Sequence, residues 1–212
     1  MKIPDILTTQ NGARTLLALT FVASAAISAT ASAQGSTPAA KDGPTLKANA
    51  ADVQFMTGMI PHHAQAVLIA GWAPSHGARD DVQRLCERIV VGQRDEIGLM
   101  QTWLKQRGLE VPPANATHMK MTMGGMTHEM LMPGMLTDEE LKQLDAARGS
   151  DFDRLFLQAM IRHHQGAISM VDDLEGADGA RQDETVFRFS QDVYADQTTE
   201  IERMTKMLAT VK

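Results

Sequence analysis

The sequence predicts an all-α protein, a four-helix bundle built from two pseudo-symmetric helical hairpins. A nine-residue phrase occurs twice, as Phe55-Met56-Thr57-Gly58-Met59-Ile60-Pro61-His62-His63 and as Phe156-Leu157-Gln158-Ala159-Met160-Ile161-Arg162-His163-His164. After each copy comes a second matching pattern, Gln-x-x-Glu-Ile-x-x-Met, at 93–100 and 197–204. Apolar residues recur at helical spacing in both halves. Each half therefore reads as a helical hairpin, and two such hairpins make a four-helix bundle.

The first 33 residues are typical of a secretory signal peptide. Lys2 and Arg14 are basic, Leu16–Ala29 is an apolar run too short to span a bilayer, and Ala31-Ser32-Ala33 fits a cleavage site after Ala33. Residues 34–50 are small and polar and predict a disordered leader. We expect a periplasmic or secreted protein that is not an integral membrane protein.

The bundle domain covers 51–212. Its first half is repeat 1, at 51–108. Its first helix covers 51–70 and contains Pro61, which should kink it because proline lacks an N–H and crowds the preceding turn. The second helix covers 80–107, and Gly108 ends it. Residues 109–136 form a methionine-rich loop. Gly124, Gly125 and Pro133-Gly134 argue against a regular element there.

The second half begins with a short helix and continues as repeat 2 at 150–211. Thr137-Asp138-Glu139-Glu140 is a capping box that starts the short helix, which Gly149 ends. The next helix runs from Ser150 to about Leu174 and should be straighter than its counterpart, because Arg162 replaces the proline. The last helix runs from Asp183 to Val211.

Composition excludes several function classes. The net charge is −6 and the basic residues form no cluster, so no nucleic-acid partner is expected. The sequence contains no nucleophile constellation for hydrolysis and no glycine-rich phosphate loop. The single cysteine, Cys86, lies on an apolar stripe and is predicted to be a buried, inert thiol.

The doubled phrase is the candidate metal site. On a helical wheel Met59 and His63 share the core-facing side with His62 at its edge. Thioether and imidazole together suit copper, above all Cu(I), with Cu(II) as the alternative. The other interpretation is that histidine and methionine only fill the core, with inward carboxylates satisfying the imidazoles. The candidate ligands of the bundle are Met59, His62, His63, Met160, His163 and His164, with Met56, Met100, Met204, Glu96 and Glu200 as further candidates.

The loop is the second candidate metal site. It holds seven methionines and two histidines at positions that no helical or strand period explains: His118, Met119, Met121, Met123, Met126, His128, Met130, Met132 and Met135. A flexible segment of this composition can wrap a soft cation. The alternatives are an adaptable apolar lid over the bundle and an oxidation-sensitive surface.

Several phrases resemble a known family. Phe55–His63, Met132-Pro133-Gly134-Met135-Leu136, Asp151-Phe152-Asp153 and Phe156–Ala167 resemble the exported bacterial family described as domain of unknown function 305, over about 52–210. The resemblance implies a ferritin-like four-helix bundle. It also implies periplasmic copper binding and copper tolerance through Met59, His62, His63, Met160, His163 and His164.

These observations predict a periplasmic copper-binding protein, not an enzyme, that buffers copper or passes it to another periplasmic copper protein. One alternative is a di-iron or di-manganese enzyme built from His63, His164, Glu96 and Glu200, although the Glu-x-x-His pattern of such centres is missing from both copies. The other alternative is a metal-free envelope module whose methionine loop docks on a partner.

Overall fold

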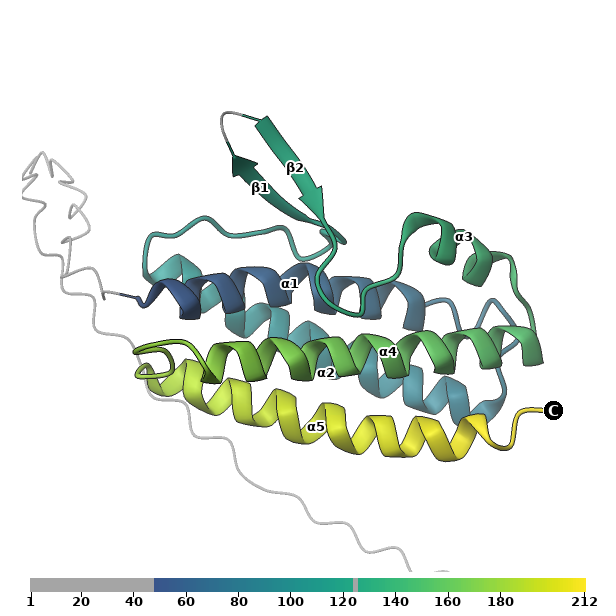
Figure 1. The fold of residues 1–212 in the computed structure, drawn as a ribbon. Coiled ribbons are helices and arrows are strands. Elements are labelled where there is room, and N and C mark those ends of the chain that lie inside the picture. The colour runs from purple at the N-terminus through teal and green to yellow at the C-terminus, as the bar shows by residue number, and fades with distance from the viewer. Residues whose placement is uncertain (1–47, 124–125) are drawn as a thin grey trace, which may run out of the picture. The chain divides into compact units, whose positions relative to one another are not determined.

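Five helices and one β-hairpin make up the part of the chain that the computed structural model describes, residues 48–123 and 126–212 (Figure 1). Four long helices form the bundle: α1 (Ala50–Ala70), α2 (Asp80–Gln106), α4 (Ser150–Glu175) and α5 (Glu184–Leu208). The predicted all-α bundle is therefore confirmed. The proposed signal peptide and the leader up to residue 47 lie outside the described residues.

The ends of the helices follow their capping residues. Asn49 accepts the Ala51 N–H at the start of α1, and Asp183 accepts two backbone N–H groups at the start of α5. Helix α3 (Asp138–Ala146) opens with the predicted capping box of Thr137 and Glu140. Helix α1 continues through Pro61.

The loop prediction for residues 109–136 was wrong in its central part. Residues Met119–Met123 (β1) and Met126–Met130 (β2) pair as antiparallel strands, with Met121 opposite His128. The alternation of methionine with polar residues is the strand period, and Gly-Gly between two such runs is typical of hairpins. The two glycines were read as breakers, although they also suit a two-residue connection.

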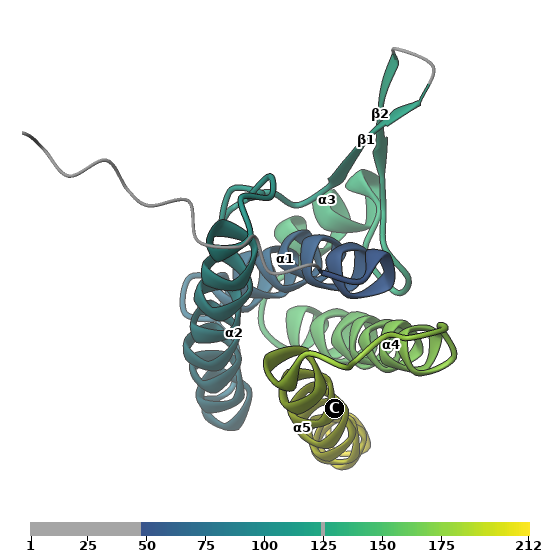
Figure 2. The same cartoon turned by 90° about the vertical axis from the view of Figure 1, so that its left-hand side faces the viewer.

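The helices pack as two hairpins that meet through their first helices. Helix α1 packs on α2, α4 packs on α5, and α1 crosses α4 (Figure 2). Two reciprocal hydrogen bonds link the hairpins. Asp52 of α1 accepts the backbone N–H of Arg181, which precedes α5, and Asp153 of α4 accepts the backbone N–H of Arg79, which precedes α2. The pseudo-twofold relation read from the sequence thus extends to the connections.

The core consists of two apolar clusters. One contains the N-terminal half of α1 and the C-terminal half of α4, including Phe55 and Leu174, and the other contains the opposite halves, including Ile69 and Phe152. Helices α1 and α4 are therefore antiparallel. Their histidines come at mid-helix, between the two clusters.

Candidate metal centre

Two adjacent histidines from α1 and two from α4 meet at the middle of the bundle. The side chains of His62, His63, His163 and His164 are all fully buried. The wheel placed His62 only at the edge of the buried face. Helix α1, however, has three neighbours, because it packs on α2 and α4 and is covered by the segment 132–136. A residue at the edge of the face that packs on one neighbour can therefore be buried by another neighbour.

The rings of His62 and His163 lie against each other where α1 crosses α4. Their centroids are 3.8 Å apart and their planes are inclined by 41°. Burial, followed by the neighbouring His63, lowers the pKa of His62 to about 3, and burial lowers the pKa of His163 well below its usual value. Both imidazoles are therefore neutral at neutral pH, which leaves a nitrogen lone pair on each.

Three of the four imidazoles present one ring nitrogen to an acceptor. His164 Nε2 donates to Glu200 Oε2 at 2.7 Å, and His62 Nε2 donates to the Pro133 carbonyl at 3.0 Å. His63 Nε2 lies 2.7 Å from Glu96 Oε2, although the angle departs from that of a hydrogen bond. Because carboxylates and carbonyls only accept, the proton is assigned to Nε2 in each ring.

The opposite nitrogens of these rings have no partner among the described residues. The Nδ1 atoms of His62, His63 and His164 are buried and unpaired, and so are both nitrogens of His163. A buried nitrogen acceptor without a partner is costly. A histidine that binds a metal through one nitrogen usually donates the other N–H to a carboxylate or a carbonyl, and this is the pattern seen here.

The predicted methionines of the bundle surround this histidine layer. Met56, Met59 and Met100 belong to one apolar cluster, and Met160 and Met204 belong to the other. All five are fully buried. The two hairpins thus supply a thioether set on each side of the histidines. Packing alone would also bury these side chains, so the imidazoles are the stronger indication.

Carboxylate and imidazole side chains alone do not form a metal site among the described residues. Within 48–123 and 126–212, no three side chains of histidine, cysteine, aspartate or glutamate are arranged to hold one metal ion. Glu96 and Glu200 each bind the histidine of their own hairpin. This differs from the shared carboxylates of the di-iron alternative. The donors that remain are unpaired imidazole nitrogens and buried thioether sulfurs, which are the ligand types that a soft cation prefers.

The loop candidates divide into two groups. Met135 is buried, and Met132 is half-buried against Gly58 and Met170, next to the histidine layer. Residues Met126, His128 and Met130 of β2 are exposed, while His118 and Met119 line a cavity with Pro61. The side chains of Met121 and Met123 lie outside the described residues. The structure therefore does not bring the exposed hairpin methionines to the histidines.

The segment 133–136 is a part of the site that the sequence reasoning missed. The Pro133 carbonyl orients His62, and Gln65 exchanges two hydrogen bonds with the backbone of Leu136 at 2.9 and 2.7 Å. A Cβ on Gly166 would overlap the Pro133 carbonyl oxygen. Gln65, two residues after the histidine pair, and Gly166, two residues after its copy, were the available signals.

Residues 52–208 match the domain of unknown function DUF305. The chain belongs to the DUF305 family. A DUF305 crystal structure from Streptomyces coelicolor, of a protein described as secreted, is 30% identical with a TM-score of 0.62, covering 75% of this chain and 92% of that one. The family resemblance read from the sequence is thereby confirmed.

Two further proteins are similar to this chain, one over most of its length and one over a short region. CopM in its Cu(I)-bound form is 27% identical with a TM-score of 0.55, covering 74% of this chain and 94% of its own; CopM structures with Cu(II) and with silver are also similar to this chain. An uncharacterized mimivirus protein, L153 of Acanthamoeba polyphaga mimivirus, is 32% identical over 59 residues, which cover 28% of this chain and 39% of that protein. None of the helices in the described ranges is both long and apolar enough to cross a membrane.

Proposed function

We propose that this DUF305 protein is an exported copper-binding protein that buffers copper or hands it on in the periplasm. One observation carries the proposal: the unpaired Nδ1 atoms of His62, His63 and His164, each on a ring whose Nε2 faces a carboxylate or carbonyl oxygen. A metal ion would satisfy these nitrogens, and the opposite acceptors would hold each ring in the required tautomer. The similarity to CopM supports copper as the metal.

The buried thioethers favour Cu(I) over Cu(II) as the bound species. Met59 precedes His63 by one turn of α1, and Met160 precedes His164 by one turn of α4, so each hairpin offers the same sulfur and nitrogen donors. Soft sulfur ligands select Cu(I), whereas zinc prefers thiolate, imidazole and carboxylate. Neutral imidazoles need not lose a proton before they bind.

The exposed methionines of the hairpin form a second, outer set of donors in this proposal. Met126 and Met130 are accessible to solvent. Exposed thioethers exchange ligands readily, which suits capture from, or delivery to, another periplasmic copper protein. The buried histidine layer suits retention. Residues 1–33, proposed as a signal peptide cleaved after Ala33, would place the protein in that compartment.

The test is an anaerobic Cu(I) titration of residues 34–212 against a chromophoric chelator, with X-ray absorption on the loaded protein. We expect tight binding with both sulfur and nitrogen neighbours. Replacing the hairpin methionines Met119, Met121, Met123, Met126 and Met130 by leucine should remove sulfur neighbours and lower the stoichiometry, while the bundle retains its nitrogen neighbours. No binding by the unmodified protein would contradict the proposal. Iron or manganese in protein isolated from the periplasm would favour the di-metal enzyme instead.

A further inference from the structure

The buried histidines need a path from solvent, and on the hairpin side a backbone segment lies over them. There the backbone of Pro133 and Gly134 lies directly on α4. A Cβ on Gly134 would overlap the Arg162 carbonyl oxygen, and one on Gly166 would overlap that of Pro133. The Pro133 carbonyl also accepts the His62 N–H. A cation arriving on this side would have to displace a backbone segment fixed by several contacts.

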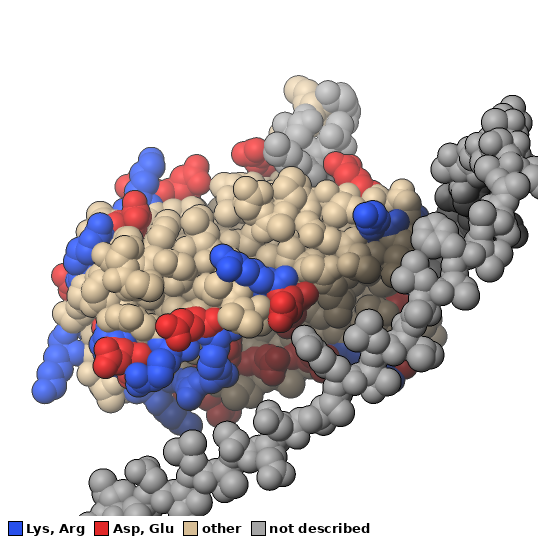
Figure 3. All heavy atoms as spheres, turned by 180° about the vertical axis from the view of Figure 1, so that it is seen from behind, with Lys and Arg blue, Asp and Glu red and all other residues tan. Residues whose placement is uncertain are grey.

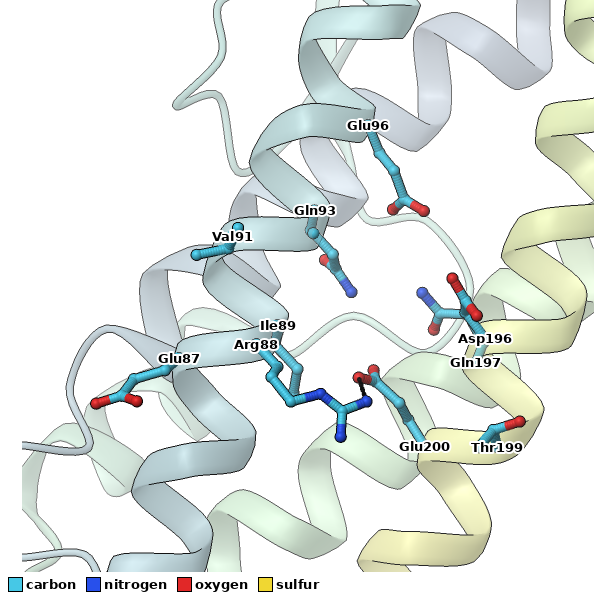
Figure 4. Close-up of a pocket in the computed structure, with 11 residues that line it drawn as sticks. Glu87, Arg88, Ile89, Val91, Gln93, Glu96, Asp196, Gln197, Thr199 and Glu200 are labelled. Atoms are coloured by element: carbon cyan, nitrogen blue, oxygen red, sulfur yellow. Dashed lines mark ion pairs between the residues drawn. The ribbon is translucent and has the colours of Figure 1, made fainter.

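The opposite side of the bundle has a groove between α2 and α5. It has a volume of about 550 Å³, and Gln93, Glu96, Asp196, Gln197 and Glu200 are among its lining residues (Figure 4). Gln93 and Glu96 of α2 and Gln197 and Glu200 of α5 point toward one another across it, whereas Glu87 and Val91 point away from it. The molecule seen from behind shows acidic side chains in the shaded lower part of this face, with Lys and Arg side chains beside them (Figure 3). The groove and the hairpin thus lie on different sides of the α1–α4 layer.

Two carboxylates connect this groove to the imidazoles. Glu96 lines the groove and lies 2.7 Å from His63 Nε2, and Glu200 lines it from the other side and accepts the His164 N–H. Both glutamates are partly exposed, whereas the histidines are fully buried. The glutamates therefore form the wall that separates the groove from the histidine layer.

The lining of the groove favours a cation. Three carboxylates, those of Glu96, Asp196 and Glu200, point into the groove against one guanidinium, that of Arg88, whose distance to Glu200 is 3.9 Å. Partial burial, and then the charges of Glu96 and Glu200, raise the pKa of Asp196. The contribution of these charges reflects a negative potential in the groove, and such a potential raises the local concentration of cations.

Two buried amides of the groove lack partners. The side chains of Gln93 and Gln197 are more than nine-tenths buried, and neither amide oxygen has a hydrogen-bond partner within the described ranges. They occupy equivalent positions in the two hairpins and aim into the groove from α2 and α5. Buried amides are normally hydrogen-bonded, so these two indicate a polar occupant.

We propose that copper reaches the histidine layer through this groove, where Glu96, Asp196 and Glu200 collect the cation and Gln93 and Gln197 line its path. The inference rests on the proposed function, because it takes copper as the cargo. It assigns a separate role to the carboxylates: they speed loading, whereas imidazole and thioether groups retain the ion. Loading rate and equilibrium affinity should therefore respond to different substitutions.

Asp196→Lys is the sharpest test, because Asp196 is exposed and contacts none of the histidines. Cu(I) supplied as its cationic acetonitrile complex is mixed with apoprotein and quenched after milliseconds with excess chelator. We expect Asp196→Lys to slow loading about tenfold at low salt, with Asp196→Asn in between, and high salt should reduce the difference. Stoichiometry at equilibrium should be unchanged.

The matched control is Asp172→Lys, which makes the same charge change on an exposed position of α4 outside the groove and should alter the rate less than twofold. The comparison is repeated with the hairpin methionines replaced by leucine. Equal rates for the two lysine variants would overturn the inference, as would slow loading caused by the hairpin replacement alone. Absence of equilibrium binding in the unmodified protein would overturn the proposed function instead.

Discussion

The imidazole of His62 lies against that of His163, with 3.8 Å between the ring centroids, at the point where α1 crosses α4. The two residues are equivalent in the doubled sequence phrase, so the pseudo-twofold axis of the bundle passes close to this pair. Neither residue has a carboxylate partner, whereas the neighbouring His63 and His164 each lie beside one. The centre of the bundle therefore holds several buried ring nitrogens that have no partner among the described residues.

This arrangement predicts that the apoprotein loses stability in mild acid. The pKa of His62 is about 3 in the folded protein and about 6.5 in an unfolded chain, so the unfolded state takes up the proton first as pH falls. The stabilisation is complete above about pH 6.5 and is lost progressively toward pH 3, at roughly 1.4 kcal/mol per pH unit. The pKa of His163 is shifted in the same direction.

Urea denaturation between pH 7.5 and 5 measures this effect in a window where most carboxylates remain ionised. His62→Leu should show a shallower dependence, because it removes the group that protonates. A free energy of unfolding that stays constant across this window would contradict the assignment of neutral, buried imidazoles.

A second prediction separates binding from packing. His163→Leu should leave the apoprotein as stable or make it more stable by about 1–3 kcal/mol, because it removes two buried nitrogens that have no partner. The same variant should bind Cu(I) more weakly. Thermal denaturation and the chelator titration measure the two effects. If His163 were purely structural, His163→Leu would instead destabilise the protein and leave Cu(I) binding unchanged.

His76 provides the matched control for that variant. It is buried too, but its Nδ1 meets the Trp72 carbonyl at 2.9 Å and its Nε2 meets the Asp145 carbonyl at 2.9 Å. His76→Leu should therefore cost about 1–3 kcal/mol, since it removes the hydrogen bonds of both ring nitrogens. Copper binding should not change. Loss of copper binding in His76→Leu would show that general destabilisation explains the effect at His163.

The doubled phrase was enough to predict the bundle and the burial of its histidines. Periodicity defines which face of a helix is apolar. Because the histidine phrase and the pattern of the following helix both occur twice, the repeat unit is a helical hairpin. It does not define how many neighbours a helix has, which is why His62 was placed at an edge. The partners of His63 and His164 were foreseeable, because Glu96 and Glu200 occupy equivalent inward positions.

Two features of the site depend on long-range geometry and were not predictable in this way. The Pro133 carbonyl reaches His62 from a segment 71 residues away in the chain. The groove exists because α2 and α5 face each other without closing, which no helical wheel of either helix reports. The hairpin was open to prediction from its alternation, but glycine signals both a break and a turn.

The close approach of the segment 133–134 to α4 gives a third prediction. Gly166→Ala places a methyl group where the Pro133 carbonyl oxygen lies, so the segment or the helix must move. We expect a loss of about 1–3 kcal/mol, typical of overpacking, and disturbance of the His62 contact. Chemical denaturation and histidine NMR resonances measure these changes.

Gly98→Ala is the control, because it is the same substitution within helix α2, where an added Cβ would meet no atom within 4 Å. It should stabilise the protein by up to about 1 kcal/mol, owing to the better helix propensity of alanine. If the two variants had similar effects on stability, backbone contact at Gly166 would not be the constraint that the structure indicates.

A fourth prediction concerns the thiol, which would be a strong ligand for a soft metal if it were accessible. Cys86 is buried in α2, and burial, reinforced by the charge of Asp153, raises the pKa of its thiol. The thiolate is the reactive and metal-binding form, so Cys86 should be inert in the folded protein. An alkylating reagent should modify it only after denaturation, and Cys86→Ala should bind the same number of copper ions. Rapid alkylation of the native protein, or loss of one copper equivalent in the variant, would instead place the thiol among the ligands.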